Sequence, residues 1–143
     1  MKLSGLHTLI AEGESLTLEL KKSTAEKDRA CRSLCALANG QGGQVVFGVT
    51  PAGKVVGQKV TDRTLEELAQ EFQGFEPTLP VHLQRIPASE GAAAGLEVLR
   101  VQVERATNIR FLARKVAEFE SLTLEIEALK SEVNQAPVKS AKA

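Results

Sequence analysis

Four charged residues near the start of the sequence are spaced so that they could act together. Glu14 and Glu19 are five residues apart, and Lys21 and Lys22 follow them. Apolar and polar residues alternate around Glu19, which is the period of a half-buried β-strand. In a regular strand the two carboxylates point to opposite faces, and they meet only if a bulge or the turn at Gly13 redirects Glu14. The alternative is a pair of solvated carboxylates beside an electrostatic rim of lysines.

A glycine-rich loop, Asn39-Gly40-Gln41-Gly42-Gly43, is the second candidate for chemistry. Loops of this kind cradle phosphates when they lead into the N-terminus of a helix. Here the loop leaves a predicted helix and enters a strand, so the helix dipole disfavours an anion. The loop also lacks the Lys-Ser or Lys-Thr of a Walker A motif and the GxGxxG spacing. It is therefore typical of a tight helix-to-strand turn in which glycine supplies a positive φ.

The cysteines and histidines show no metal-binding or nucleophilic pattern. Cys31 and Cys35 are four residues apart among alanine and leucine, which is typical of two buried small side chains on one helix face. His7 and His82 are far away in the sequence, and there is no CxxC or HxxxH pattern. A catalytic cysteine would need a histidine partner, and the sequence offers no signature of one.

The composition limits the function classes. The 143 residues carry 18 basic and 18 acidic side chains, so any attraction to nucleic acid must come from a local patch. Five phenylalanines, with no tryptophan and no tyrosine, argue against a platform on which bases stack. No apolar run is long enough to cross a membrane, and the first residues lack the core of a signal peptide. We therefore expect a cytoplasmic protein that does not bind membranes.

Hydrophobic periodicity predicts an α/β (α+β) fold with a mixed sheet of about five strands and helices packed on it. Helices are expected around residues 3–10, from the capping box at Ser23 to Asn39, and from the capping box at Thr64 to about Phe72. The expected strands are residues 14–21, 44–49, 54–57, 81–86 and 96–103.

The pattern changes near Asn108. From Leu112 to Val133 apolar residues follow near-heptad spacing, which is typical of a coiled-coil-like helix. The sequence therefore predicts a domain at residues 1–105, a helical arm at 106–133 and a disordered tail at 134–143. The arm could form a homodimer, dock on a partner protein or pack on its own domain.

Three blocks of the sequence form one recognisable pattern. They are E-S-L-T-L-E-L-K-K-S, then A-L-A-N-G-Q-G-G-Q-V-V-F-G-V, then G-K-V-V-G. Together they resemble the Schlafen-type AlbA-like domain family (AlbA_2) over roughly residues 1–105. The resemblance implies a mixed α/β, AlbA-like fold. Bacterial members look like modules of transcriptional regulators and are often described as ATP-binding, and animal relatives act as endoribonucleases on structured RNA.

The resemblance also implies roles for single residues. Glu14 and Glu19 would be two of three acidic residues that hold a divalent metal, Mg²⁺ or Mn²⁺, and Lys21 would be the basic residue beside them. The third acid follows the strand ending Ile-Gly-Val in the family, and here that position reads Thr50-Pro51. Asp62 is the next acid along, but no motif places it in the site.

We therefore expect a nucleic-acid-binding module, regulatory in role, that contacts DNA or structured RNA. Its phosphate contacts are assigned to Lys21, Lys22, Arg29, Arg32, Asn39, Gly42, Gly43, Lys54, Lys59 and Arg63. One alternative is a metal-dependent endoribonuclease, weakened by the missing acid. Others are an ATP-binding domain, which rests on the resemblance alone, and a scaffold that recruits a partner through helix 108–133.

Overall fold

The computed structural model of the chain describes residues 1–89, 95–112 and 126–131. The chain divides into two compact units, Met1–Phe111 and Leu112–Ala143. No helix in the described ranges is both long and apolar enough to cross a membrane.

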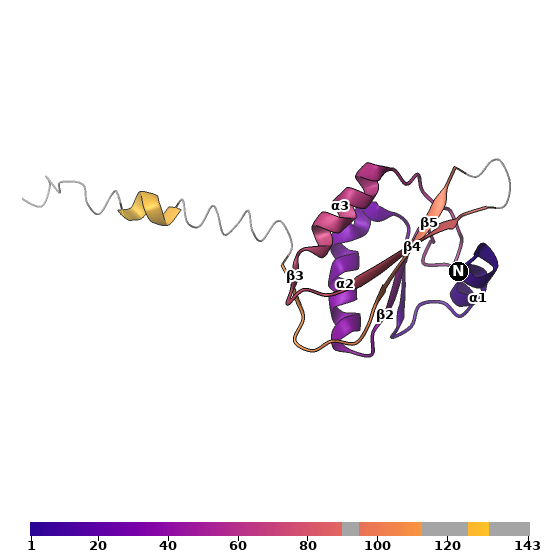
Figure 1. Cartoon of the computed structure of the whole chain (residues 1–143), viewed down its shortest axis with the longest axis horizontal. Helices are drawn as coiled ribbons and strands as arrows, with labels where there is room; N and C mark the ends of the chain where they lie inside the picture. The colour runs from indigo at the N-terminus through magenta and orange to yellow at the C-terminus, as the bar shows by residue number, and fades with distance from the viewer. Residues whose placement is uncertain (90–94, 113–125, 132–143) are drawn as a thin grey trace, which may run out of the picture. The chain divides into compact units, whose positions relative to one another are not determined.

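A four-stranded mixed sheet forms the centre of the first unit (Figure 1). Its strands lie in the order β1 (Leu18–Lys21), β2 (Gly43–Phe47), β5 (Glu97–Val103) and β4 (Val81–Pro87). β1 and β2 are parallel, whereas β5 is antiparallel to both of its neighbours. A separate two-stranded sheet pairs β3 (Phe75–Glu76) with β6 (Arg110–Phe111). The mixed α+β class predicted from the sequence is confirmed.

Helices lie on both faces of the four-stranded sheet (Figure 1). One face carries α2 (Lys27–Asn39), which follows the short 3₁₀ turn η1 (Thr24–Glu26), and α3 (Asp62–Phe72). The other face carries α1 (Leu3–Ala11). Because side chains alternate along each strand, the two faces fill two separate apolar clusters.

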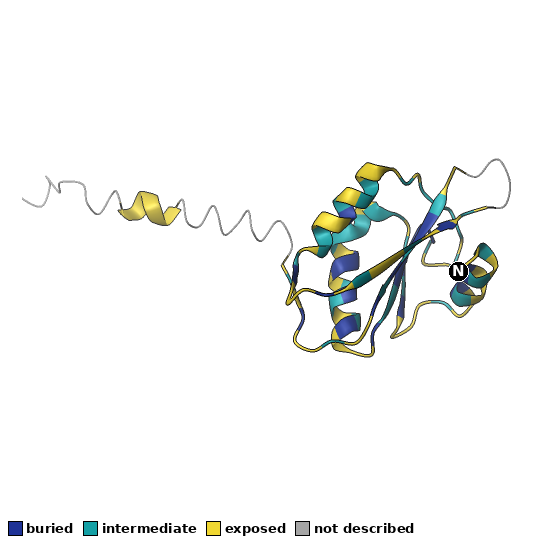
Figure 2. Cartoon of the chain, in the orientation of Figure 1, coloured by how far each residue is buried: buried dark blue, intermediate teal, exposed yellow. Residues whose placement is uncertain are grey.

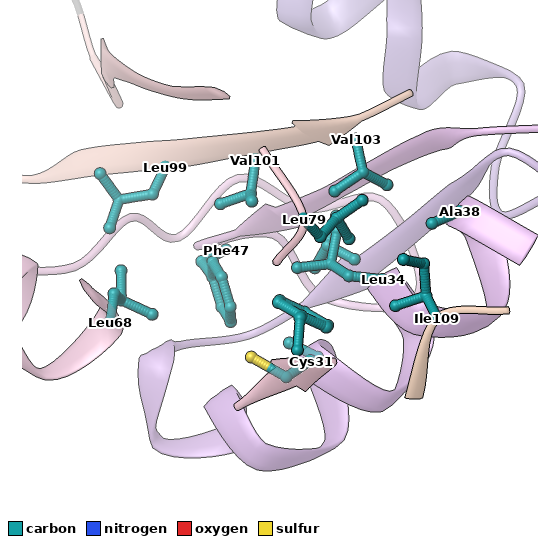
Figure 3. Packing of buried hydrophobic residues seen from close by; sticks show 13 residues of the cluster. Cys31, Leu34, Ala38, Phe47, Leu68, Leu79, Leu99, Val101, Val103 and Ile109 are labelled. Carbon is teal, nitrogen blue, oxygen red and sulfur yellow. The ribbon is translucent and has the colours of Figure 1, made fainter. Parts of the chain in front are cut away.

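The larger cluster lies between the sheet and α2 and α3 (Figure 3). Its fully buried side chains include Phe47 and Leu99 from the strands and Leu34 and Leu68 from the helices. Each contributes about 1.5–3 kcal/mol of burial free energy. The smaller cluster lies under α1 and contains Leu6, Ile10, Leu18, Leu20, Val46, Val49, Ile86 and Val98. Buried residues accordingly follow the strands and the inner side of α2 (Figure 2).

The first strand is shorter than its alternation predicts. β1 begins at Leu18, because the preceding residues turn so that the Ser15 N–H donates to the Leu18 carbonyl (2.9 Å). Leu16, which the alternation places in the core, is 84% exposed. The predicted strand at residues 54–57 is also reduced, to one isolated bridge between Val49 and Val55.

Two helices begin at other residues than the capping boxes predict. The Ser23 hydroxyl accepts from the Ala25 N–H (3.2 Å) and caps η1 rather than α2. α3 begins at Asp62, because Thr61 and Thr64 form a reciprocal capping box one turn earlier than expected.

Residues 106–111, predicted to begin the helical arm, instead complete the first unit. Ile109 is buried in the larger cluster, and the Phe111 ring centroid lies 5.3 Å from that of Phe75. Asn108 has a positive φ of 59°, which no α-helix contains. In the second unit residues 126–131 are helical, and the rest of the arm beyond Leu112 lies outside the described residues. Its coiled-coil character and partners stay predictions.

Cys31 is fully buried, and this burial raises the pKa of its thiol from 9.0 to about 12. Because the unfolded chain ionises first as the pH rises, the stability that the neutral thiol contributes is complete below about pH 9 and is lost between about pH 9 and pH 12. We expect the free energy of unfolding to fall over this range, and to fall less in Cys31→Ala, as measured by urea titration. An equal fall in both proteins would contradict the assignment.

Candidate nucleic-acid interface

Glu14 lies at the free edge of the sheet. Its Oε1 accepts a hydrogen bond from the backbone N–H of Leu20 (3.2 Å). The carbonyl of the next residue, Lys21, points toward β2, where it accepts from the Gly48 N–H. Because the backbone groups of successive residues point to opposite sides of a strand, the Leu20 N–H points away from β2. A carboxylate on the exposed donor of an edge strand blocks pairing with another chain. The turn before β1 thus redirects Glu14 to the edge of the sheet.

Glu19 and Lys21 project from β1 toward α2. Their partners on β2, Val45 and Phe47, belong to the larger apolar cluster. Lys21 Nζ lies 3.0 Å from Glu19 Oε1, and the two side chains are 14% and 31% exposed. The ion pair therefore engages Lys21 inside the domain. Among the contacts of the described residues, no hydrogen bond or ion pair joins Glu14 to Glu19.

A pocket of about 360 Å³ lies beside Glu19, between the start of β1 and the second half of α2. Its other lining residues are small, apolar or neutral: Leu16, Ser33, Ala36, Leu37, Gly40 and Gln41. Because the pocket holds one carboxylate and no basic side chain, its charge does not favour a phosphate.

The residues implied to hold a divalent metal do not form a three-carboxylate set. Thr50 stands at the position of the third acid, and its hydroxyl accepts from the Lys54 N–H (3.0 Å) to close the turn after β2. In the ranges that the structure describes, no group of three His, Cys, Asp or Glu side chains is placed to hold a metal ion. The two glutamates and Thr50 therefore do not fit a metal centre.

Asn39 ties the end of α2 to the segment before β6. Its Nδ2 donates to the Ile109 carbonyl (2.8 Å) and to the Cys35 carbonyl (3.0 Å), and its Oδ1 accepts from the Ile109 N–H (2.9 Å). The amide therefore uses both donor hydrogens and its oxygen within the domain. Asn39, which was predicted to contact phosphate, thus makes structural hydrogen bonds, and we call this set of bonds the clasp.

Gly42 and Gly43 bring backbone segments into close contact. The Gly42 N–H donates to the Leu37 carbonyl (2.7 Å), so this donor is not free for a phosphate. A Cβ on Gly42, which has a φ of +79°, would lie 3.0 Å from the Val103 carbonyl oxygen. A Cβ on Gly43 would lie 2.5 Å from the Thr17 carbonyl oxygen. The loop is thus the tight helix-to-strand turn that its sequence and polarity indicate.

The predicted basic contacts divide into paired and unpaired side chains. Arg32 pairs with Asp28 (3.3 Å) and Arg63 with Glu67 (3.0 Å), each along one exposed helix face. Such pairs contribute only about 0.3–0.5 kcal/mol, but they neutralise the local charge. Of the basic side chains that the sequence predicted as phosphate contacts, Lys22, Arg29, Lys54 and Lys59 are exposed and form no ion pair in the described part of the chain.

Gln58 links the segment after β1 to the start of β5, although no motif in the sequence indicates this role. Its side-chain oxygen accepts from the Thr24 N–H (2.9 Å), and its side-chain nitrogen donates to the Thr24 hydroxyl (3.0 Å). Its backbone pairs with Glu97 at the start of β5. Gln58 therefore joins η1 to the segment before α3. Because Thr24 and Gln58 are 34 residues apart, a local sequence pattern does not indicate this contact.

Comparisons with known proteins place the chain in a family. The model of the family described as Schlafen, AlbA_2 matches residues 14–127. Among solved structures, the N-terminal domain of a RecG-related protein from Nitrosomonas europaea is 20% identical, with a TM-score of 0.55 over 74% of each chain. At this identity the likeness shows a shared fold. A search of curated proteins finds no match. Because the family model spans most of the sequence, the chain belongs to the Schlafen AlbA_2 family, as its three sequence blocks predict.

Proposed function

We propose that the domain binds nucleic acid through the phosphate backbone, in a regulatory and non-catalytic role. The observation that carries this proposal is the group of unpaired, exposed basic side chains at one end of the sheet. These are Lys22, Arg29, Lys54 and Lys59, which we call the strand-end cations.

The topology explains why the strand-end cations share one end of the sheet. β1 and β2 are parallel, so both finish at the same end of the sheet. Lys22 and the turn that contains Lys54, which follow these strands, therefore lie at that end. α2 begins at this end of the sheet, so Arg29 in its first turn lies there as well. Lys59 follows Gln58, whose side chain is bonded to Thr24 beyond the end of β1.

Two further findings support the proposal. The chain belongs to the Schlafen AlbA_2 family, whose resemblance implies modules of regulators or enzymes that act on RNA. The structurally similar protein from Nitrosomonas europaea is named as a putative ATP-dependent DNA helicase RecG-related protein. Zero net charge, together with the small group of strand-end cations, favours binding of modest affinity that weakens as salt rises. ATP binding has no comparable support, because the glycine loop uses the Gly42 N–H within the turn.

We expect the double variant Lys22→Gln/Lys59→Gln to bind duplex DNA and a structured RNA hairpin roughly tenfold more weakly than the wild type. This estimate takes about 0.7 kcal/mol for each exposed charge. Since each lost phosphate contact releases one fewer counterion, the slope of log K against log salt should fall by about two. Fluorescence anisotropy at low and physiological salt measures both quantities.

The matched control is Lys2→Gln/Arg85→Gln, which changes the net charge equally. Lys2 precedes α1, and Arg85 is neutralised by Glu97. Equal losses in the two double variants would mean that only overall charge matters, and no binding by the wild type to either ligand at low salt would refute the proposal. The tighter of the two ligands identifies the nucleic acid.

A further inference from the structure

Among the described residues, the sheet face under α1 is only partly covered. The residues that α1 covers lie toward one end of the strands and form the smaller apolar cluster. Toward the other end, five side chains on the same face are polar and are half-buried or exposed. They are Gln44 on β2, Arg100 and Gln102 on β5, and His82 and Gln84 on β4, and we call them the polar sheet patch.

The register of the strands puts these residues side by side. Arg100 is directly opposite Val46 on one neighbour and Gln84 on the other, and Gln102 is directly opposite Gln44 and His82. Directly opposed residues point to the same face of a sheet. Since Val46 belongs to the cluster under α1, the whole patch faces the α1 side.

Two glutamines hold the Arg100 side chain in place. Its Nε donates to Gln44 Oε1 (2.5 Å), and its Nη1 donates to Gln84 Oε1 (3.2 Å). A guanidinium has five N–H donors in a rigid plane. Two bonds from neighbouring strands therefore fix the plane of the group, while the other donors have no hydrogen-bond partner among the described residues.

The charge of Arg100 is not neutralised within the described ranges, where no carboxylate forms an ion pair with it. Arg85 follows Gln84, the residue directly opposite Arg100, so it lies on the other face of the sheet, where both oxygens of Glu97 bind it (2.6 and 2.9 Å). Hydrogen bonding to Glu97 raises the pKa of Arg85, whereas partial burial lowers the pKa of Arg100. A partly desolvated cation without an anion is unfavourable, so a bound anion would stabilise it.

We infer that the polar sheet patch is a phosphate-binding site in which Arg100 contacts a phosphodiester of a nucleic-acid strand lying across the uncovered part of the sheet. The guanidinium fork matches two phosphate oxygens, and half-exposed amides beside it provide further donors. The patch has no aromatic ring, so it contacts the backbone and does not stack bases. This inference rests on the proposed function and adds a second surface to the strand-end cations.

A titration with inorganic phosphate tests the site without any nucleic acid. In an NMR experiment on the full chain, we expect saturable shifts of the Arg100 Nε–H and of the side-chain amides of Gln44 and Gln84. Sodium chloride at equal ionic strength should not produce these shifts. Their absence in phosphate would overturn the site, whether or not the protein binds nucleic acid.

A second measurement assigns the phosphate to nucleic acid. Arg100→Gln should weaken binding of the preferred nucleic acid roughly tenfold and lower the salt slope by about one, whereas Arg85→Gln, with the same change in net charge, should leave both unchanged. Arg100→Lys should keep the slope and lose affinity, because it retains the charge without the fork. Phosphate shifts combined with no selective loss in Arg100→Gln would overturn the nucleic-acid assignment. Phosphate shifts in a protein that binds neither nucleic acid would reject the proposed function and this assignment together.

Discussion

Gly43→Ala is expected to lower the free energy of unfolding by about 3 kcal/mol or more. The new Cβ would lie 2.5 Å from the Thr17 carbonyl oxygen and 3.0 Å from Leu37 Cδ2. Inserting a methyl group into a packed site costs about 1–3 kcal/mol when side chains can adjust, and here the nearest atom belongs to the backbone. The same Thr17 oxygen accepts from the Gln44 N–H (2.9 Å), the first bond between β1 and β2. The new methyl group would therefore disrupt the hydrogen bonding between β1 and β2.

Urea denaturation measures this effect, and Gly95→Ala is the matched control. A Cβ on Gly95 meets no atom of the described residues within 4 Å, so its replacement should change the free energy of unfolding by no more than about 0.5 kcal/mol. A Gly43→Ala variant as stable as Gly95→Ala would show that β1 and β2 are not held as closely as the structure indicates.

Asn39→Ala is expected to lower the free energy of unfolding by about 2–3 kcal/mol. The variant loses three hydrogen bonds and leaves the N–H of Ile109 without its protein partner in a partly buried setting. Each unsatisfied group of this kind costs about 1–3 kcal/mol. Hydrogen exchange at the Ile109 amide should accelerate by a larger factor than exchange in β2, because the clasp holds that segment directly.

Two variants separate the clasp from a simple loss of polarity. Gln41→Ala removes an exposed amide that makes no side-chain hydrogen bond in the described part of the chain, and should be nearly neutral. Asn39→Asp keeps the acceptor for the Ile109 N–H but loses both donations and adds a negative charge at the end of α2, so it should be destabilised as well. If Asn39→Ala unfolds like Gln41→Ala, the clasp contributes no stability and Asn39 becomes available for a ligand.

The motif residues show how far sequence reasoning reaches. The blocks around Glu19 and Asn39 predicted the family and the mixed fold, because strand periodicity and the glycine turn are local properties. The role of Asn39 could not be predicted, because its partner Ile109 is 70 residues away. For the same reason the contact of Gln58 with Thr24, 34 residues apart, has no local signal.

The errors in the predicted elements have physical causes. Leu16 continues the alternation of β1. However, the Ser15 N–H donates to the Leu18 carbonyl, and this turn leaves the Leu16 side chain exposed. Ile109 and Phe111 lie just before the predicted helical stripe, which starts at Leu112. They are two residues apart, which is strand spacing, and pairing of β6 with β3 makes this segment extended. In both places contacts made by the fold override a window of a few residues.

The strand order has a consequence for how the chain acquires its structure. β2 lies between β1, which precedes it closely, and β5, with which it is joined by side-chain contacts such as Gln44 to Arg100 across 56 residues. During synthesis from the N-terminus, α2 and β2 leave the ribosome long before β5 can cover them, and Asn39 waits longer still for Ile109. Because pairing of β2 with β5 closes this long loop, we expect the pairing to form late in folding and to limit the folding rate.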